Sequence, residues 1–250
     1  MSASTPVSPW GGPWPRLSAH YFASDAHIGG GNPDAEQRLF WFLESIRGKA
    51  DSLYILGDLF EFWFEYGRSI PKPGFRALAE LSELNRTGTR IGYLKGNHDF
   101  WFKDFWQREL GAEAADELDV VLDGKRVFLT HGDTLDRSFV PRLFRVLMRS
   151  RLNGWLYSQL HPDIGIGLAL AVARANRVKN SKPSLVEDMA RFAEGRLSSG
   201  FDIVVMGHSH VPEVRRLAGG VYLNVGDWMT HFTYGVIRDG VASLQRFEES

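Results

Sequence analysis

Seven side chains of the types that bind divalent metals follow short apolar runs along this chain. The runs, near residues 20–24, 53–57, 91–96, 127–130 and 203–207, are rich in β-branched and aromatic residues, which predicts buried strands. Because the carboxyl ends of parallel strands gather at one edge of a sheet, we expect the seven side chains to meet there. They are Asp25, His27, Asp58, Asn97, His131, His208 and His210.

The expected chemistry is that of a pair of metal ions. The chain has no cysteine, so a metal must be held by His, Asp, Asn or Glu, a mixture that suits Mn²⁺, Fe or Zn²⁺ better than Ca²⁺. Asp58 stands alone after its run and has two oxygens to share, so we expect it to bridge both ions. The other ligands divide into Asp25, His27 and His210 for one ion and Asn97, His131 and His208 for the other. Two ions about 3.5–4 Å apart lower the pKa of a shared water, which can attack phosphorus in line.

His98 and Asp99 directly follow the expected ligand Asn97. His98 therefore lies near the position of a substrate phosphate, where as a cation it would stabilise the transition state or protonate the leaving oxygen. Asp99 is expected to orient the His98 ring. The alternative is that His98 only supports the ligands.

Three further histidines are candidates for other roles. His20 lies inside the first apolar run and is expected to be structural. His161 precedes a proline and is expected in a turn. His231 follows Gly226-Asp227-Trp228 and either lines the site or lies beside it.

The elements that must position these residues alternate between strands and helices, which predicts an α/β fold. Strands are expected at 18–24, 51–56, 90–94, 120–122, 126–130, 202–206, 213–217, 221–224, 233–237 and 241–247, and helices at 34–47, 75–86 and 100–110. Asp123-Gly124 is a hairpin turn signal. The aromatic cluster Phe60 to Phe64, just past Asp58, is either core packing over the site or a wall for an apolar or base-stacking substrate.

Between residues 139 and 200 the strand signals give way to helical patterns, which predicts a helical insertion between core segments 18–138 and 201–250. From 139 to 183 there are eight Lys or Arg residues and one acid, a net charge of +7; the whole chain is at −1, so the remainder is at −8. A basic, apolar helical segment favours an anionic amphiphile or a membrane surface. The alternative is a helical subdomain with solvated arginines. An acidic body disfavours a nuclease.

Composition bounds the remaining possibilities. With 250 residues, 44% of them hydrophobic, the chain suits one large α/β domain or one domain with an insertion. The longest apolar run, Ile164 to Ala173, is half of the roughly 20 residues that span a bilayer. Residues 1–17 read as a flexible arm, whose first 15 residues carry no positive charge and no apolar core of a signal peptide. The absence of cysteine fits a cytoplasmic protein.

The motifs together resemble those of the calcineurin-like metallophosphoesterases. The resemblance is carried by Asp25-x-His27, Gly57-Asp58, Gly96-Asn97-His98-Asp99, His131-Gly132 and Gly207-His208-x-His210. It implies a four-layer α/β sandwich, with two facing mixed sheets, helices outside and a dinuclear metal site.

Within that superfamily the chain is similar to the UDP-2,3-diacylglucosamine diphosphatases of lipid A synthesis, through Gly57 to Trp63, His131 to Leu135 and Gly226 to Trp228. The similarity implies attack on the α-phosphorus of the pyrophosphate, which releases UMP and 2,3-diacylglucosamine 1-phosphate (lipid X). It implies two ions, with Mn²⁺ preferred, and a helical lid over the acyl chains. Implied substrate contacts are Asn97, His98, Asn176, Lys179, Lys182 and His208. It also implies peripheral association with the cytoplasmic face of the inner membrane.

One residue departs from that family, since many members carry Arg where His98 stands, and His is the commoner residue of the superfamily. The competing enzyme is a related phosphoesterase acting on a different nucleotide or on a phosphoprotein. The competing non-enzyme is a binding module that uses the same scaffold, but such a protein would be expected to lose ligands, and this chain has the full set.

Overall fold

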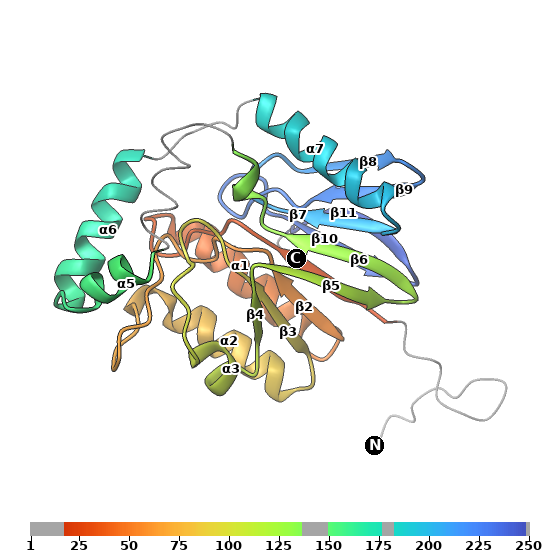
Figure 1. The fold of residues 1–250 in the computed structure, drawn as a ribbon. Coiled ribbons are helices and arrows are strands. Elements are labelled where there is room, and N and C mark those ends of the chain that lie inside the picture. Colours follow the sequence, from red (N-terminus) through yellow and green to blue (C-terminus); the bar gives the residue numbers. More distant parts are fainter. Residues whose placement is uncertain (1–17, 137–149, 177–182, 249–250) are drawn as a thin grey trace, which may run out of the picture.

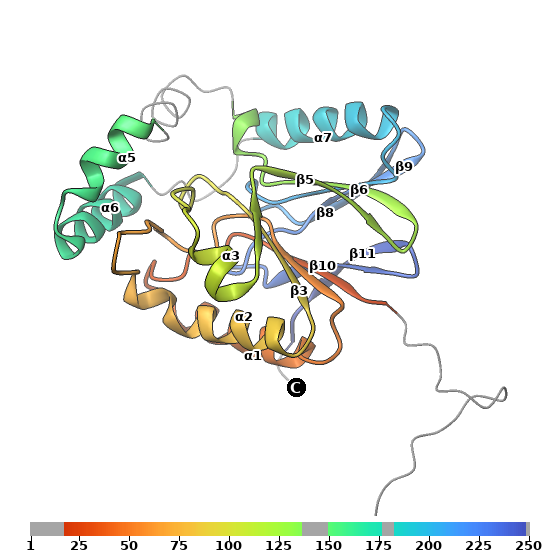
Figure 2. The same ribbon diagram turned by 60° about the horizontal axis from the view of Figure 1, so that its bottom comes forward.

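The computed structural model describes residues 18–136, 150–176 and 183–248. Two β-sheets face each other, and helices cover the outer face of each sheet (Figures 1 and 2). The expected arm at residues 1–17 lies outside the described residues, as do Lys179 and Lys182.

The first sheet has six strands in the order β11-β10-β1-β2-β3-β4. Its strands are β1 (His20–Ala23), β2 (Ser52–Ile55), β3 (Arg90–Leu94), β4 (Glu113–Ala115), β10 (Thr233–Arg238) and β11 (Val241–Arg246). Strands β1 to β4 are parallel, while β10 runs antiparallel to both of its neighbours. The carboxyl ends of β1, β2 and β3 therefore lie side by side.

The second sheet has five strands in the order β5-β6-β7-β9-β8. Its strands are β5 (Glu117–Leu122), β6 (Lys125–Thr130), β7 (Ile203–Met206), β8 (Glu213–Leu217) and β9 (Gly220–Asn224). Strands β6, β7 and β9 are parallel, and β5 and β8 are antiparallel at the two edges. Asp123-Gly124 forms the β5–β6 hairpin turn, as predicted.

The alternation of side chains along each strand builds two separate apolar layers. In the first sheet, Phe22, Tyr54 and Leu94 face the second sheet and pack against its inner residues such as Leu129 and Val205. The alternate residues of the same strands face outward against helices. Nearly continuous apolar strands are what a sheet buried on both faces requires.

Helices on both outer faces complete the four layers, which confirms the predicted fold. Helices α1 (Pro33–Ile46), α2 (Phe75–Arg86) and α3 (Phe105–Leu110) cover the first sheet. Asn32 caps α1 by accepting the Ala35 N–H at 3.2 Å. On the other side, α7 (Pro183–Ser198) packs Met189, Ala193 and Leu197 against the second sheet.

One local prediction is wrong, and one strand was missed. The helix expected at 100–110 begins only at Phe105, because the Trp101 carbonyl accepts the Glu65 N–H and Glu65 Oε2 accepts the Lys103 N–H at 2.7 Å. Strand β4 was not predicted, since its three residues, Glu-Ala-Ala, have weak strand propensity and follow from pairing with β3 alone.

Helices α5 (Arg151–Ser158) and α6 (Pro162–Asn176) form a hairpin at the left of Figure 1, beside the open end of the two sheets. The expected insertion at 139–200 contains these two helices and also α7. Because α7 is buried against the second sheet, it forms part of the core packing, unlike the α5–α6 hairpin.

Candidate dinuclear metal centre

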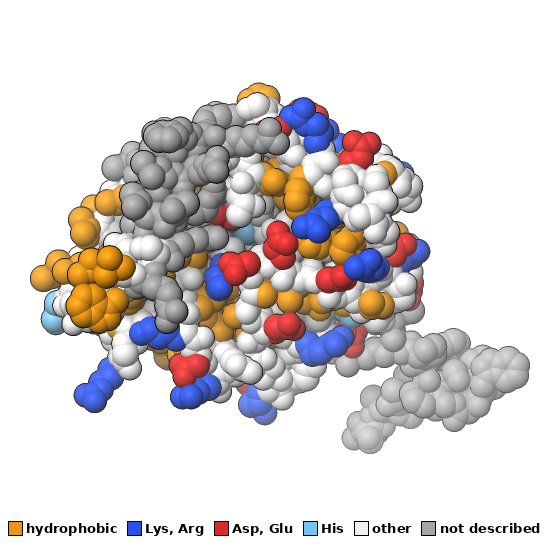
Figure 3. Space-filling model, viewed as in Figure 1, with side chains coloured by type: hydrophobic (Ala, Val, Ile, Leu, Met, Phe, Trp, Pro, Cys, Tyr) orange, Lys and Arg blue, Asp and Glu red, His pale blue; other side chains and the backbone are white. Residues whose placement is uncertain are grey.

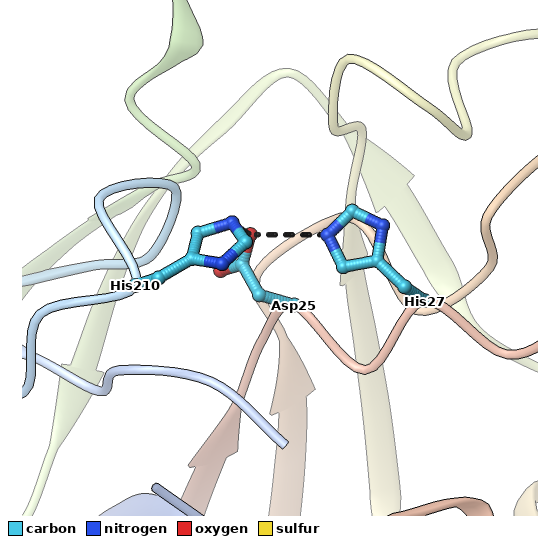
Figure 4. Close-up of side chains that lie close together, drawn as sticks. All are labelled: Asp25, His27 and His210. Atoms are coloured by element: carbon cyan, nitrogen blue, oxygen red, sulfur yellow. Dashed lines mark ion pairs between the residues drawn. The ribbon is translucent and has the colours of Figure 1, made fainter. Parts of the chain in front are cut away.

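The parallel strands of both sheets end at the same side of the molecule, and the loops that follow them bring the predicted ligands together. Asp25 Oδ1 lies 3.2 Å from His210 Nε2 and 3.9 Å from His27 Nε2. Figure 4 shows the Asp25 carboxylate between the two rings, with His210 arriving from the second sheet. These three side chains can place one ligand atom each around a single ion.

A second group lies next to the first. His131 Nε2 is 3.5 Å from Asp58 Oδ2 and 3.3 Å from Asn97 Oδ1. His208 offers a second ring nitrogen, which lies within 4.8 Å of the ligand atoms of Asp58 and His131. Asp58 Oδ2 is also 3.9 Å from His27 Nε2, so this carboxylate lies between the two groups.

The donor set fits a pair of cations. Among the described residues, Asp25 Oδ1 and His27 Nε2 are buried and have no hydrogen-bond partner. Burying such atoms unpaired is costly, whereas a cation between them would satisfy both. Carboxylate, amide and imidazole ligands are those that Mn²⁺, Fe and Zn²⁺ accept.

Hydrogen bonds behind the histidines leave the nitrogens that face the site free to bind metal. His131 Nδ1–H donates to the Leu56 carbonyl at 2.6 Å, which fixes the tautomer whose Nε2 lone pair faces Asp58. His27 Nδ1 is 3.1 Å from Glu61 Oε2, so Nε2 of that ring faces Asp25 and Asp58. Sequence reasoning did not identify Glu61 as a site residue, because no local pattern reveals its contact with His27.

The ligand loops adopt backbone conformations that most residues avoid. Five of the predicted ligands have positive φ, and they are Asp25 (55°), His27 (48°), Asp58 (51°), His208 (63°) and His210 (57°). Asp tolerates this left-handed region better than most residues, but each instance still carries strain, and such strain gathers at functional sites. A Cβ on Gly96 would lie 2.0 Å from Asp58 Oδ1, so this glycine is needed for close approach.

Charges in the group respond to one another. Burial would raise the pKa of Asp25 and Asp58, but His210 beside the first and His131 beside the second hold both pKa values below the usual range. Burial lowers the pKa of His131, yet attraction to Asp58 and Asp25 outweighs it and raises that pKa to about 10. Burial and the neighbouring His131 lower the pKa of His208 to about 4. The two buried carboxylates, Asp25 and Asp58, thus favour positive charge next to them.

A family model described as calcineurin-like phosphoesterase matches residues 21–212, the stretch that carries all seven predicted ligands. This chain is a calcineurin-like phosphoesterase. It is therefore a hydrolase of phosphoric esters from a family that works with divalent metal ions, as its motifs predicted.

Curated relatives cover nearly the whole phosphoesterase chain. A UDP-2,3-diacylglucosamine hydrolase of Porphyromonas gingivalis is 32% identical, covering 92% of this chain and 97% of the relative. The protein of the same name from Aeromonas salmonicida is 31% identical, covering 90% and 92%. A solved archaeal phosphodiesterase is 15% identical with a TM-score of 0.48, covering 91% of this chain and 98% of the other.

His98 and Asp99 of the phosphoesterase have different partners from those expected. His98 Nδ1 lies 3.0 Å from the Glu61 carbonyl, which orients the ring, and the His98 N–H donates to Asp58 Oδ1 at 2.9 Å. The Asp99 carboxylate is fully buried and accepts hydrogen bonds from Asp58 N, Gly96 N, Phe60 N and the Tyr93 hydroxyl. Asp99 therefore fixes the loops that carry Asp58 and Asn97 rather than the His98 ring.

Asp227 is a second site residue that sequence reasoning passed over. Its Oδ1 accepts three backbone N–H groups from 229–231, and its Oδ2 lies 2.9 Å from His231 Nδ1 and 4.0 Å from His210 Nδ1. His231 is half exposed beside the site. His20 is buried against Ser52 and Asp123, and His161 is exposed before α6.

An aromatic cluster joins the site to the α5–α6 hairpin. It consists of Phe62, Phe64, Tyr66, Trp101 and Tyr157, with ring centroids 4.6–6.4 Å apart between neighbours. Phe60 and Trp63, by contrast, are buried under the first sheet's helices. The Phe60 to Phe64 segment thus divides between core packing and a contact to the hairpin. Asn176 ends α6, and its side chain is outside the described set.

Proposed function

We propose that this phosphoesterase hydrolyses the pyrophosphate of UDP-2,3-diacylglucosamine, releasing UMP and 2,3-diacylglucosamine 1-phosphate (lipid X) in lipid A synthesis. The observation that carries the proposal is the apolar helical hairpin fastened directly beside a two-metal ligand set by the cluster of Phe62, Phe64, Tyr66, Trp101 and Tyr157. A diphosphate linked to a diacylated sugar needs both parts. The names of the relatives agree with this substrate.

We propose that the site would hold two Mn²⁺ ions, with Asp58 as a ligand shared by both. In this assignment Asp25, His27 and His210 would hold the first ion, and Asn97, His131 and His208 would hold the second. When bound, the two ions activate the attacking water and neutralise negative charge on the phosphoryl group. The distances among these ligand atoms support the assignment.

The chain's own residues then position the substrate and move a proton. His98 Nδ1–H is held by the Glu61 carbonyl, so Nε2 is the nitrogen available to the substrate. As a cation, His98 would donate from Nε2 to the leaving oxygen or to a phosphoryl oxygen. Asn97, which precedes His98 in the chain, and His208 would contact the same phosphate. Asp99 accepts hydrogen bonds from the backbone N–H groups of Asp58 and Gly96, and so fixes the loops that carry Asp58 and Asn97.

The hairpin would hold the acyl chains as a lid. Its exposed apolar side chains form the orange area at the left of Figure 3, and they are Leu152, Trp155, Leu156, Leu160, Ile164, Leu168 and Val172. Exposed apolar patches of this kind mark ligand or membrane contacts. We place the end of the insertion before Pro183, because α7 packs on the second sheet. Asn176, Lys179 and Lys182 would meet sugar or phosphate groups.

We also propose that the protein associates peripherally with the cytoplasmic face of the inner membrane, where a diacylated substrate resides. The exposed apolar hairpin and the +7 charge of residues 139–183 support this placement. Within the described ranges, no helix is long and apolar enough to cross a membrane.

Product analysis tests the proposed function. Purified protein with Mn²⁺ is given UDP-2,3-diacylglucosamine or a generic aryl phosphodiester, with an Asn97→Ala variant as control. Release of UMP that disappears in the variant is the expected result. Cleavage of the aryl ester alone would instead indicate a phosphoesterase for another nucleotide or a phosphoprotein. Cleavage of neither would contradict the proposal.

A further inference from the structure

Glu61 touches two functional histidines from one position. The residue is 2% exposed, and Oε2 lies 3.1 Å from His27 Nδ1. Its carbonyl oxygen lies 3.0 Å from His98 Nδ1. Its N–H donates to the Ile28 carbonyl at 3.0 Å, which ties it to the loop that carries His27. Glu61 is therefore held rigidly behind both rings.

The contact to His27 has a defined consequence for metal binding. With Nδ1–H donated to Glu61, the Nε2 lone pair faces Asp25 Oδ1 and Asp58 Oδ2, each 3.9 Å away. A carboxylate behind an imidazole ligand fixes the ring and raises the basicity of the nitrogen that binds the metal. Removing such a partner typically costs about 10–100-fold in metal affinity.

The side-chain effect of Glu61 is directed at one of the two ligand groups. His131, in the other group, donates its Nδ1–H to the Leu56 carbonyl and has no need of Glu61. Asp227 lies behind His210, which belongs to the same ligand group as His27, but its 4.0 Å separation and its bond to His231 make that contact weaker.

We propose that Glu61 is a positioning residue that selectively sets the affinity of the site formed by Asp25, His27 and His210, while its backbone carbonyl aims His98 at the substrate. This inference rests on the ligand assignment made under the proposed function. It adds that different residues behind the ligands set the affinities of the two ions, so that the binding of one ion can be weakened without that of the other.

Metal binding in two backgrounds tests the inference. The full chain is stripped with a chelator, and bound Mn²⁺ is measured by equilibrium dialysis and elemental analysis. In a His131→Ala background, which weakens the second site, Glu61→Gln should weaken the retained ion about 10–100-fold. In a His210→Ala background, which weakens the first site, the same change should alter the retained ion less than about twofold. Equal weakening in both backgrounds, or none in the first, would overturn the proposal.

Glu65→Gln is the matched control, because Glu65 is also a buried carboxylate of the same segment but accepts the backbone N–H of Lys103 instead of contacting a ligand. It should leave both affinities unchanged. If Glu61→Gln does not fold, Glu61→Asp, which keeps the charge at a longer distance, replaces it with a smaller loss expected in the first background alone. The measurement uses no substrate, so it can be interpreted even if the proposed reaction does not occur.

Discussion

At the scale of single residues, the partners behind each imidazole define what the ring can do. His27, His98 and His131 all use Nδ1 for a hydrogen bond to Glu61 or Leu56, so Nε2 is the reactive nitrogen in every case. The neutral tautomer suits a metal ligand, whereas a proton donor must carry both protons. His98 differs from the other two because its side chain is only partly buried and can reach the substrate.

The first prediction separates the two roles open to His98. In His98→Ala, kcat should fall about 10²–10⁴-fold if the ring donates a proton. Mn²⁺ binding should change little, because the Asp58 contact comes from the His98 backbone. Among aryl phosphodiesters, the loss of kcat should be smaller when the leaving phenol is more acidic, because such a phenol leaves with less help from a proton donor. A uniform loss across leaving groups would instead assign His98 to charge stabilisation.

At the scale of elements, each ligand follows a strand whose neighbours fix its end. Strands β1, β2 and β3 in one sheet and β6 and β7 in the other are parallel, so their following loops converge. The Asp99 carboxylate joins the loops by accepting hydrogen bonds from the backbone N–H groups of Asp58, Phe60 and Gly96. The ligand geometry is therefore held by hydrogen bonds from loop backbone N–H groups to the Asp99 carboxylate.

The second prediction concerns Gly96. In Gly96→Ala the new methyl would meet Asp58 Oδ1, so Asp58 or the loop must move, and bound Mn²⁺ per chain should fall with activity on an aryl phosphodiester. Gly195→Ala in α7 is the control, because its Cβ meets nothing within 4 Å. It should keep full metal content and add about 0.5–1 kcal/mol to the free energy of unfolding. Full metal content in Gly96→Ala would contradict the packing argument.

At the scale of the whole molecule, a rigid sandwich carries an apolar hairpin at the side of its metal site. The sandwich carries the residues of the reaction. The hairpin offers an apolar surface that a water-soluble nucleotide substrate would not need. The aromatic cluster of Phe62, Phe64, Tyr66, Trp101 and Tyr157 connects the hairpin to the sandwich. Substrate selection and chemistry should thus respond to different mutations.

The third prediction tests that separation. Leu156→Glu places a charge on the exposed apolar face of the hairpin. A leucine side chain that a bound acyl chain covered there would contribute about 1.5–3 kcal/mol to binding. We expect kcat/KM for UDP-2,3-diacylglucosamine to fall about 10–100-fold, with no change for an aryl phosphodiester. Val121→Glu, at an exposed apolar position of β5, should affect neither substrate. Equal losses on both substrates would argue against a lid.

The fourth prediction is the pH dependence of stability without metal. The folded pKa of His131 is raised to about 10, so its contribution is fully present below its unfolded value near 6.5 and is lost as pH rises toward 10. The thermal midpoint of chelator-treated protein should therefore fall between pH 6.5 and 10. Saturating Mn²⁺ should remove this slope, because the ion replaces the proton's charge. A His131→Gln variant that kept the slope would assign it to another group.

The sequence by itself predicted the candidate ligands, the strand that precedes each of them and the family. These features are local, since an apolar run, a glycine and a polar side chain stand next to one another in the chain. The α/β class followed from the alternation of strands and helices, and the four-layer arrangement followed from the resemblance to the calcineurin-like metallophosphoesterases.

Only the tertiary structure decided which residues lie behind the ligands. Glu61 contacts His27, and Asp99 holds the Asp58 loop rather than the His98 ring, because folding brings together residues that are 34 and 41 positions apart in the chain. The same holds for β4, which forms by pairing with β3, and for α7, whose burial on the second sheet separates it from the hairpin. Such contacts depend on which strands are neighbours, and no short stretch of sequence encodes that.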